Sequence, residues 1–524
     1  MSSAPVIPQR RPVESRDPAT GQIWQKYPTA DDEGVAAALA RARAAQGPWA
    51  ATTPTDRARI VARFHEALYR RRTEVASIVT RESGKPYADA VGVDVTVALD
   101  FAKWTAREAP RFLRGSWRGS AGITMWRKRV RFERKPLGVI GVITPWNYPF
   151  FLPTACVLPA IACGNAVILK PSEFTPGCGA ILAELWRDAG LPDGVMQVIQ
   201  GDGVTGAALC QSGVEKMVFT GSAAAGRHVA LACAERMIPC SLELGGSDAA
   251  IVLADADVDH AADGIVWTRF ANAGQTCVAP KRVFVVGEAY EPFVAAAAAA
   301  VRALKVGAGS DAATEVGPMI RPAATATIRA QLDDAVAGGA VIAAQATAPP
   351  GDGYFPPTLL TGVRSSSRVM HEETFGPLLP VLRVRDEAEA IVRANESEFG
   401  LSASVWTRDR ARGFAVARQL EAGTVVINDA ITVVGMPDVP YGGVKSSGLG
   451  RLHGVAGLEE CVHSVAIVDD RFATWKQPWW FRYSEAHLSH LEDYQRFAHG
   501  RSIAERLRGL IGTIALMLSQ RGAR

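Results

Sequence analysis

The sequence predicts an α/β fold built on a doubly wound parallel sheet. Short apolar runs alternate with helical segments between residues 139 and 221, and a second alternating set follows Gly246. Strands of parallel sheets are covered on both faces, so they are near-continuous apolar runs. The chain has 524 residues, which is too long for one hydrophobic core. We therefore expect two or three domains, two of them α/β.

The segment from Asp31 to about Arg107 has a helical pattern. Residues 34–46 are rich in alanine, and apolar residues recur at spacings of three and four after a cap signal at Thr55 and Asp56. We expect a helical lead-in before the first sheet.

Nine apolar runs are expected to be buried strands. The first set lies at 139–144, 166–170, 195–200 and 217–221, with helices at 175–189 and 203–211. The second set lies at 250–253, 283–286, 381–384, 402–406 and 424–428. The run of six alanines at 295–300 is expected to be helical, because alanine is the best helix former. Ligands of such sheets bind at the carboxyl ends of the strands.

Three further segments lie outside this alternation. Residues 120–135 and 459–470 are extended and partly alternating, and we assign them to a small oligomerisation sheet. Residues 471–524 form a C-terminal tail with Trp475, Trp479 and Trp480 followed by a helical run. Two interpretations of the tail stay open: an amphipathic helix packed on its own or a partner subunit, or a helix on a membrane interface. The apolar face of that helix comprises Ile503, Leu507, Leu510, Ile511, Ile514 and Leu518.

Charge and cysteine content exclude several classes of protein. The tail carries nine basic and four acidic residues, so the rest of the chain is nearly neutral and gives no reason to expect nucleic-acid binding. The eight cysteines show no CxxC pair or regular spacing, which favours neither a metal site nor a disulfide framework. Residues 1–13 lack the apolar stretch of a secretory signal, so we expect a cytoplasmic protein.

Two segments carry residues suited to covalent catalysis. Cys277 lies among small, turn-forming residues in 272–280 (NAGQTCVAP), where a ligand can reach the sulfur. Glu243 is a single carboxylate on an apolar strand that runs into Gly245 and Gly246, as expected for a general base. The alternatives are an inert buried thiol and a carboxylate paired with a structural cation. Together the two residues predict a covalent intermediate that is then hydrolysed.

Three weaker motifs follow other strands. Residues 217–226 form a strand, a glycine turn and a helix start that can bind a phosphate, although the spacing is Gly-x4-Gly. Asn147, between Pro145 and Pro149, can donate to an oxyanion or cap the next helix. Residues 170–173 offer a cation and an acceptor for ribose hydroxyls, or form a surface turn.

These segments, in this order, resemble the aldehyde dehydrogenase superfamily. The matching blocks are 145–149 (PWNYP), 170–173 (KPSE), 219–222 (FTGS), 243–246 (ELGG), 274–277 (GQTC), 372–377 (EETFGP) and 442–448 (GGVKSSG). The resemblance covers about residues 15–470. It implies a Rossmann-like dinucleotide-binding domain (1–119 and 136–246), a catalytic domain (247–458), oligomerisation segments (120–135 and 459–470) and the tail. It also implies a homodimer or homotetramer.

The resemblance implies a role for each catalytic residue. Cys277 would attack the aldehyde carbon, and Asn147 with the backbone N–H of Cys277 would hold the oxyanion. Glu243 would activate water to cleave the thioester. Relatives that pass the acyl group to coenzyme A typically lack this carboxylate, so release of a free acid is favoured. The hydride acceptor would be NAD, and no metal is implied.

The resemblance also implies contacts to the cofactor. Lys170 and Glu173 resemble the adenosine-ribose contacts, Ser222 the pyrophosphate contact, and Glu373 with Phe375 the nicotinamide-ribose contacts. Glu173 would repel a 2'-phosphate, which favours NAD; NADP stays an alternative because Lys170 can approach a phosphate. The full expected set is Thr144, Pro145, Trp146, Lys170, Ser172, Glu173, Gly203, Phe219, Gly221, Ser222, Glu373 and Phe375.

The chain departs from the family pattern after Gly450-Arg451. Many hydrolytic members have a glutamate next, whereas this chain has Leu452-His453, which leaves Glu243 to act alone. The motif wording resembles the branch that acts on medium- to long-chain aliphatic or aromatic aldehydes. Succinate semialdehyde is the alternative substrate, and the functions of a coenzyme A acylating enzyme and of a non-catalytic binding protein also stay open. Candidates for an apolar lining are Trp146, Phe150, Phe151 and Trp267.

Overall fold

The protein is described by a computed structural model, which covers residues 11–120, 125, 127–351, 353–471, 477, 480–481 and 483–519. It divides into two compact units, Met1–Leu113 with Pro136–His463, and Arg114–Lys135 with Ser464–Arg524. The tail residues Trp475, Trp479, Arg521 and Arg524, and part of the segment 120–135, lie outside the described residues.

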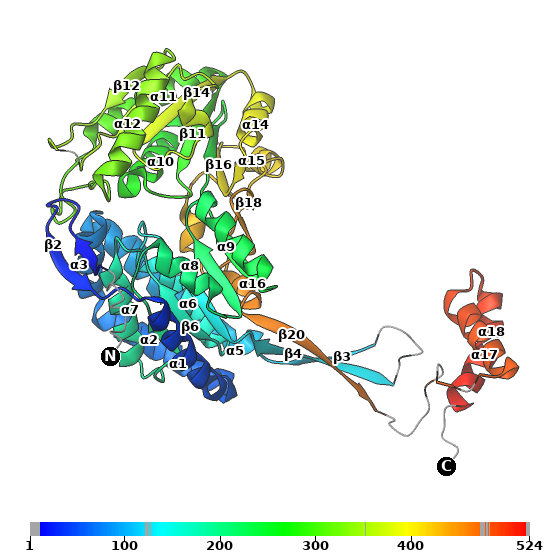
Figure 1. Ribbon diagram of the computed structural model, residues 1–524. Helices are drawn as coiled ribbons and strands as arrows, with labels where there is room; N and C mark the ends of the chain where they lie inside the picture. The colour runs from blue at the N-terminus through cyan, green and yellow to red at the C-terminus, as the bar shows by residue number, and fades with distance from the viewer. Residues whose placement is uncertain are drawn as a thin grey trace, which may run out of the picture. The chain divides into compact units, whose positions relative to one another are not determined.

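The first unit begins with a β-hairpin that the sequence pattern did not indicate, followed by the expected helices. Thr53, and not Thr55-Asp56, caps the second long helix: its hydroxyl accepts from Asp56 N at 3.1 Å. The elements are β1 (Val13–Arg16), β2 (Ile23–Tyr27), α1 (Asp32–Ala51), α2 (Pro54–Arg70), α3 (Arg72–Ser83), α4 (Tyr87–Asp89), the π-helix η1 (Ala90–Thr96) and α5 (Val97–Phe112), drawn in blue in Figure 1.

Among the described residues, the first sheet has the strand order β19-β9-β8-β5-β6-β7. All pairings are parallel except that of β19 with β9. The strands are β5 (Val139–Ile143), β6 (Ala166–Lys170), β7 (Met196–Val198), β8 (Lys216–Thr220), β9 (Cys240–Glu243) and β19 (Gly448–Leu449); the helices are α6 (Phe151–Ala162), α7 (Pro176–Asp188), α8 (Gly203–Gln211) and α9 (Ala223–Glu235). The expected strands and helices of this set are confirmed.

The second sheet has the order β12-β13-β14-β11-β10-β16-β17, as far as the structure is described. Its strands are β10 (Asp248–Val252), β11 (Pro280–Val286), β12 (Val341–Gln345), β13 (Thr358–Thr361), β14 (Leu378–Val384), β16 (Ser402–Trp406) and β17 (Thr424–Ile427). The five expected strands are present. The edge strand β12 was not predicted, because it is short, alanine-containing and mostly exposed.

Helices cover this second sheet, and Figure 1 shows α10, α11 and α12 beside β11 and β14. The alanine run lies in α11, as expected. The remaining elements are α10 (Val258–Phe270), η3 (Ala271–Gly274), η4 (Gly287–Ala289), α11 (Tyr290–Ala303), α12 (Pro322–Ala337), α13 (Arg368–His371), α14 (Glu387–Asn395), β15 (Phe399–Gly400), α15 (Arg410–Ala417), η5 (Thr432–Gly435), β18 (Val444–Lys445) and α16 (Gly454–Glu459). The predicted division into two domains at residue 246 stays a prediction.

The second unit contains a small sheet of order β20-β4-β3. Its strands are β3 (Ser116–Gly119), β4 (Lys128–Pro136) and β20 (Val462–Asp470), so extended structure in the two predicted segments is confirmed and begins before residue 120. The role of this sheet in oligomerisation stays a prediction.

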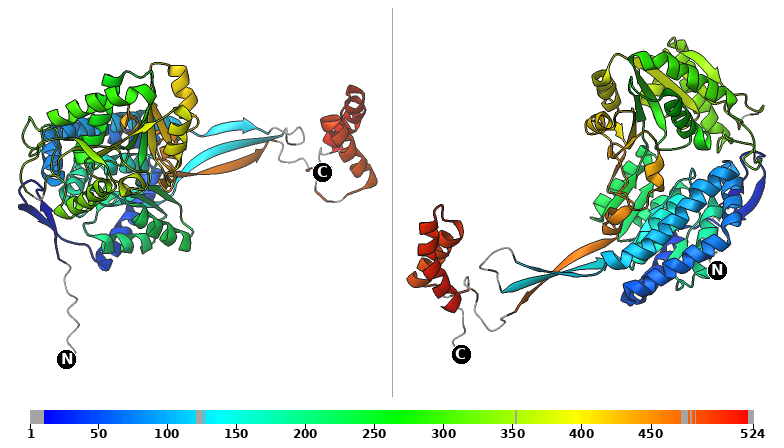
Figure 2. Two further views of the ribbon diagram at one scale, coloured as in Figure 1. Left: turned by 90° about the horizontal axis from the view of Figure 1, so that it is seen from above. Right: turned by 180° about the vertical axis from the view of Figure 1, so that it is seen from behind.

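Helices α17 (Glu485–His499) and α18 (Ile503–Ser519) pack side by side in the same unit, as both views of Figure 2 show. Their contact uses small residues: a Cβ on Gly509 or Gly512 would overlap Asp493. The apolar stripe predicted for this helix therefore does not face α17. Five of its residues are 48–78% exposed, namely Ile503, Leu507, Ile511, Ile514 and Leu518. No helix in the described part of the chain is long and apolar enough to span a membrane.

Candidate active site

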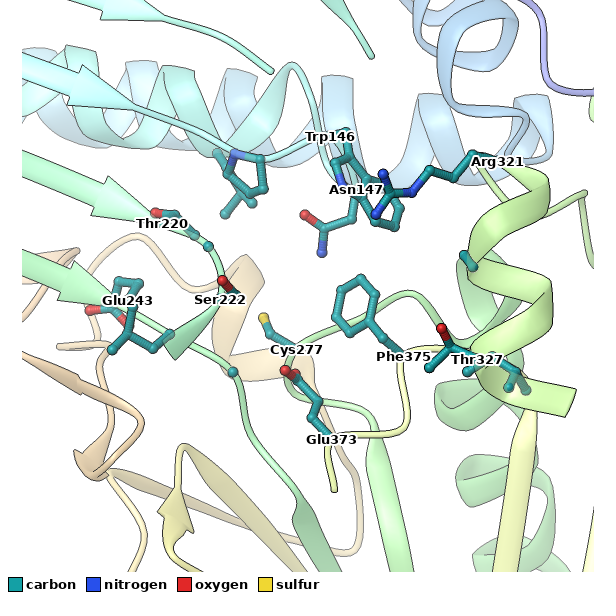
Figure 3. Close-up of a pocket in the computed structure, with 17 residues that line it drawn as sticks. Trp146, Asn147, Thr220, Ser222, Glu243, Cys277, Arg321, Thr327, Glu373 and Phe375 are labelled. Atoms are coloured by element: carbon teal, nitrogen blue, oxygen red, sulfur yellow. The ribbon is translucent and has the colours of Figure 1, made fainter. Parts of the chain in front are cut away.

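The three predicted catalytic side chains line one cavity of about 300 Å³ in the first unit (Figure 3). Asn147 follows the carboxyl end of β5, and Glu243 ends β9. Cys277 lies between η3 and β11, in the loop that leads into strand β11 of the second sheet. The carboxyl ends of parallel strands in one sheet meet at one edge, which explains why Asn147 and Glu243 converge here, whereas Cys277 reaches them from the loop before β11 of the second sheet.

The loop that carries Cys277 has an unusual backbone. Asn272, Ala273 and Gly274 have φ values of 52°, 55° and 73° in succession. A Cβ on Gly274 would lie 2.5 Å from the carbonyl oxygen of Gly376, so only glycine allows this approach. Left-handed backbone at Ala273 is costly, and such conformations persist where the surroundings hold them.

Side chains fasten this loop to the turn that follows β5. The Asn147 amide Nδ2 donates to the Gln275 carbonyl at 3.1 Å, and Asn272 Nδ2 donates to the Asn147 carbonyl at 2.9 Å. The Tyr148 hydroxyl bonds the Thr276 hydroxyl at 2.7 Å. The thiol of Cys277 and the amide of Asn147 are thus held in a fixed relation.

Cys277 has a pKa raised to about 11. Burial is the main cause, because a thiolate loses hydration in the protein interior. The ammonium of Lys281 and the hydroxyl of Tyr441, whose Oη lies 3.6 Å from Sγ, lower the pKa of this thiol in opposition.

Glu243 is buried, and neither carboxylate oxygen has a hydrogen-bond partner among the described residues. Burial raises its pKa well above that of an ordinary carboxyl, and Arg451 opposes the rise. In Figure 3 the carboxylate points away from the Cys277 sulfur. A raised pKa suits a general base, because proton transfer is efficient when the pKa lies near the working pH.

Glycines and polar groups line the same cavity beside the catalytic residues, and Figure 3 shows Ser222 and Glu373 next to Cys277. Gly221, Ser222 and Gly245 line it together with Glu373 and Phe375. Ser222 caps α9 by accepting from Ala225 N at 3.3 Å. The carboxylate of Glu373 accepts from Gly246 N at 3.1 Å. Exposed main chain at a helix N-terminus suits a phosphate.

The aromatic residues predicted as an apolar lining separate into three environments. Trp146 lines the cavity and packs edge-to-face on Phe375, with ring centroids 5.5 Å apart. Phe150 and Phe151 are fully buried in the core, and Trp267 is 51% exposed on α10. The prediction for these last three is therefore wrong for this cavity, because core packing and surface position use them instead.

A second cavity, of about 1090 Å³, lies beside the predicted adenosine contacts. It is lined by Glu173, Phe174, Asp202 and Val204, and Arg321 lines both cavities. Gly203 lies between Asp202 and Val204 at the start of α8. The donor and acceptor groups and the bare glycine backbone of the two cavities fit a long ligand that carries phosphates and sugars.

Several predicted cofactor residues lie outside both cavity linings. Thr144, Ser172 and Phe219 are buried. Lys170 is also buried, and its ammonium donates to the carbonyls of Pro171 at 2.9 Å and Gly201 at 2.7 Å. Pro145 and Trp146 line the first cavity.

Three groups near the site were not predicted from the sequence: Lys281, Arg321 and Tyr441. Lys281 lies four positions after Cys277, and Tyr441 directly precedes the 442–448 motif. Their positions next to these motifs could have indicated both residues as candidates for the site. Arg321 had no such signal, because its approach to the site follows from the packing of α12.

Comparison with known proteins gives one consistent result. A model of the aldehyde dehydrogenase family matches residues 6–467. The 4,4'-diapolycopene aldehyde oxidase of Methylomonas sp. is 36% identical over 489 residues, covering 93% of this chain and 91% of that protein. The succinate-semialdehyde dehydrogenase (NADP(+)) of Escherichia coli (strain K12) is 37% identical over 451 residues, covering 86% of this chain and 92% of that protein.

A solved structure agrees. The crystal structure of Mycobacterium tuberculosis aldehyde dehydrogenase complexed with NAD+ has a TM-score of 0.83 and 34% identity, and covers 89% of this chain and 96% of that chain. The family match stops at residue 467, before the two C-terminal helices. Sequence and fold agree across most of the chain, and the chain belongs to the aldehyde dehydrogenase family.

Proposed function

We propose that this protein oxidises an aldehyde to the free carboxylic acid with NAD, through an acyl group carried on Cys277. The observation that carries the proposal is the convergence of Cys277, Asn147 and Glu243 on one cavity from separate elements. A thiol, an amide donor and an unpaired buried carboxylate are the three groups that thioester formation and hydrolysis need.

The first half of the reaction builds a bond on sulfur. The Cys277 thiolate attacks the carbonyl carbon, a C–S bond forms, and the carbonyl π electrons move to oxygen. Asn147 uses one N–H of its amide on the Gln275 carbonyl, and its second N–H is free to donate to this oxyanion. When bound, the nicotinamide dinucleotide supplies the acceptor for the hydride that leaves this carbon, and a thioester remains on Cys277.

The second half breaks that bond with water. The Glu243 carboxylate takes a proton from water, the hydroxide oxygen adds to the thioester carbon, and the C–S bond breaks to release the acid. The unpaired oxygens of Glu243 support this role, because no hydrogen bond among the described residues holds them in place. The carboxylate must turn toward Cys277, since it points away in Figure 3.

The preference for NAD rests on the second cavity. Glu173 lines it, where a carboxylate would bind ribose hydroxyls and repel a 2'-phosphate. The ammonium of Lys170 is occupied by two main-chain carbonyls, which supports the same preference. Binding titrations with NAD and NADP test this, and tighter binding of NADP would contradict it.

The proposed substrate is a medium- to long-chain aliphatic or aromatic aldehyde. The surroundings of Cys277 away from the cofactor end are apolar, with Val278, Leu401, Val433 and Tyr441 buried together. An apolar environment favours an aldehyde with a hydrocarbon body, because burial of apolar surface drives its binding.

A semialdehyde that carries a carboxylate is the second candidate. Arg321 points into the cavity beside Trp146 in Figure 3 and offers a cation for such a group. The relative named succinate-semialdehyde dehydrogenase supports this candidate as well. Initial rates with alkanals, benzaldehyde and succinate semialdehyde separate the two candidates. If the semialdehyde is the substrate, Arg321→Met should lower the initial rate with succinate semialdehyde and leave the rates with the other aldehydes unchanged.

The test of the reaction itself uses Cys277→Ala. We expect loss of aldehyde-dependent NADH formation with retained NAD binding. Turnover in this variant would refute the proposal. The product is identified by mass spectrometry with and without coenzyme A, because a coenzyme A thioester in place of the free acid would refute the hydrolytic step.

We assign the small sheet of the second unit to contacts between copies of the chain, as a homodimer or homotetramer. Its strands expose apolar side chains, among them Trp117, Ile467 and Val468. Light scattering after gel filtration tests the assignment, with Val468→Glu expected to lower the assembled fraction and an unchanged mass counting against it.

The exposed stripe of α18 is the proposed site of peripheral membrane contact for an otherwise cytoplasmic enzyme. Apolar side chains exposed along one helix face bury readily at a lipid interface. After flotation with liposomes, the native chain should be recovered in the liposome fraction, and the Leu507→Glu, Ile511→Glu double variant should stay in the soluble fraction. Leu231→Glu, at an exposed apolar position on α9, is the matched control; equal recovery of all three proteins would reject the proposal.

A further inference from the structure

Tyr441 is the residue outside the predicted set that lies against the reacting sulfur. We propose that Tyr441 is a further catalytic residue, whose hydroxyl donates a hydrogen bond to the Cys277 thiolate and stabilises it before aldehyde attack. The proposal rests on the role assigned to Cys277 above.

The geometry fits a donor placed directly on the nucleophile. Tyr441 Oη lies 3.6 Å from Cys277 Sγ, within the range of hydrogen bonds to sulfur. Tyr441 is buried, and its ring packs with Val278, Leu401 and Val433. Water therefore competes poorly for the hydroxyl, and an electrostatic contact is stronger here than at the surface.

The Tyr441 side chain is held rigidly by the segment in which this chain departs from the family pattern. Tyr441 N donates to the Leu452 carbonyl at 2.8 Å, and Leu452 N donates back at 2.7 Å. The His453 ring stacks on the tyrosine ring, with centroids 5.1 Å apart and planes 19° apart. Leu452 and His453, which stand where the family resemblance implies a glutamate in many hydrolytic members, thus fix the position of the phenol.

The direction of the hydrogen bond follows from the charges around it. Burial and the neighbouring Cys277, Glu243 and Asp248 raise the pKa of Tyr441 well above its usual value, so the hydroxyl keeps its proton. A thiolate has no proton to give, so Tyr441 must be the donor.

Several charged groups face the sulfur. Lys281 lowers the pKa of the Cys277 thiol, whereas Asp248 and Glu373 raise it. Burial lowers the pKa of His453 to about 3, so this ring is neutral and adds no charge. Together with Lys281, the Tyr441 hydroxyl lowers the pKa of the thiol.

A second buried tyrosine offers a matched comparison. Tyr148 lies on the other side of the same loop, and its hydroxyl bonds the Thr276 hydroxyl at 2.7 Å. Tyr441→Phe and Tyr148→Phe each delete one buried hydroxyl next to residues 276–277. Only the first deletes a donor in contact with the sulfur.

The experiment measures the rate of alkylation of Cys277 by iodoacetamide from pH 6 to 10.5, without aldehyde or cofactor. Peptide mass spectrometry follows Cys277, and all proteins carry Cys240→Ser because Cys240 has a pKa lowered to about 7 and would consume reagent. Loss of a hydrogen bond to a charged group should raise the apparent pKa of the thiol by about one unit. The rate at pH 8 should therefore fall about tenfold in Tyr441→Phe.

Tyr148→Phe should leave the pH dependence of the alkylation rate of Cys277 unchanged, even if turnover changes. Tyr441→Met, which also lacks a donor, should shift the titration in the same direction as Tyr441→Phe. Rates for Tyr441→Phe that coincide with those of the unsubstituted protein from pH 6 to 10.5 overturn the proposal, and so does an equal fall in rate for Tyr148→Phe, which is what a packing defect around the loop gives. The alkylation does not depend on turnover, so it stays informative if Cys277→Ala proves active and the proposed function fails.

Discussion

The ammonium of Lys281 contacts the main chain of Cys277 directly. Its Nζ donates to the Cys277 carbonyl at 2.5 Å and to the Thr276 carbonyl at 3.1 Å, and it lies 3.8 Å from a carboxylate oxygen of Glu373. A buried cation therefore both shapes the loop and stabilises negative charge on the sulfur.

Replacing Lys281 with methionine should move the alkaline limb of kcat/KM to higher pH, because the thiol loses a cation that lowers its pKa. The variant should also unfold more easily, by about 1–3 kcal/mol, because the buried Thr276 and Cys277 carbonyls lose their hydrogen-bond donor. Steady-state kinetics from pH 6 to 10 and thermal denaturation check both effects. Lys305→Met, at an exposed position, is the control; an unmoved pH profile in Lys281→Met would contradict the electrostatic role.

The native enzyme should become more active as the pH rises through the neutral range. The thiol has a pKa of about 11, so the reactive thiolate increases with pH throughout this range. Glu243 also has a raised pKa, so it loses its proton, and becomes a base, at higher pH than an ordinary carboxyl does. Both effects have the same sign. A profile of kcat/KM that falls between pH 6 and 9 would be inconsistent with both assignments.

Glu243→Gln should abolish thioester hydrolysis yet make the protein more stable at pH 8. The folded state raises the pKa of Glu243, so the native protein has full stability below the ordinary carboxyl pKa and loses it as the pH rises through the raised value. Glutamine avoids this cost of about 1–3 kcal/mol. Melting curves at pH 4.5 and pH 8 test this: the advantage of the variant should be seen at pH 8 only, and no gain there would disprove it.

Gly274→Ala should strongly reduce both folding yield and activity. Its φ of 73° disfavours alanine, and a Cβ would lie 2.5 Å from the Gly376 carbonyl oxygen, which cannot move freely because Arg269 donates to it. Gly92→Ala is the control, because this residue lies in the helix η1, is followed by Val93 and not by a proline, and a Cβ there meets nothing within 4 Å. Equal expression and melting temperature of the two variants would show that the loop tolerates a side chain.

Cys240 should be the first cysteine alkylated at pH 7. Interaction with the Cys233 thiol lowers its pKa to about 7, whereas burial raises the pKa of Cys156 above its usual value and that of Cys210 to about 11. Brief iodoacetamide treatment and peptide mapping check the order. Preferential labelling of Cys156 or Cys210 would contradict it.

The apolar runs of the sequence were enough to predict most of the buried strands, because strands such as β6 and β16 are covered on both faces and need continuous apolar residues. The buried strand β13 was missed, because its four residues include only two large apolar side chains, Leu359 and Leu360. Edge and short strands were not predictable in this way. The strand β12 exposes most of its residues, and β15 and β18 have two residues each, so their pairing depends on neighbours distant in sequence.

The residues of the candidate site likewise divide into those that a local motif indicates and those that only the folded structure brings to the site. Cys277, Glu243 and Asn147 lie in local motifs, and the sequence therefore indicated them. Tyr441 adjoins the 442–448 motif, which could have indicated it, whereas Arg321 reaches the site through the packing of α12, which no local pattern contains. Lys170 illustrates the opposite case: its motif predicted a ligand contact, yet its ammonium is used by the carbonyls of Pro171 and Gly201.

The hydrogen bonds among Asn147, Asn272 and Gln275 cross from one sheet's connecting loop to the other's. Any movement that widens the cavity must carry the thiol and the amide as one rigid piece. Ligands can therefore enter and leave through small movements of the residues that line the cavity. The distance between the Cys277 sulfur and the Asn147 amide is preserved from one turnover to the next.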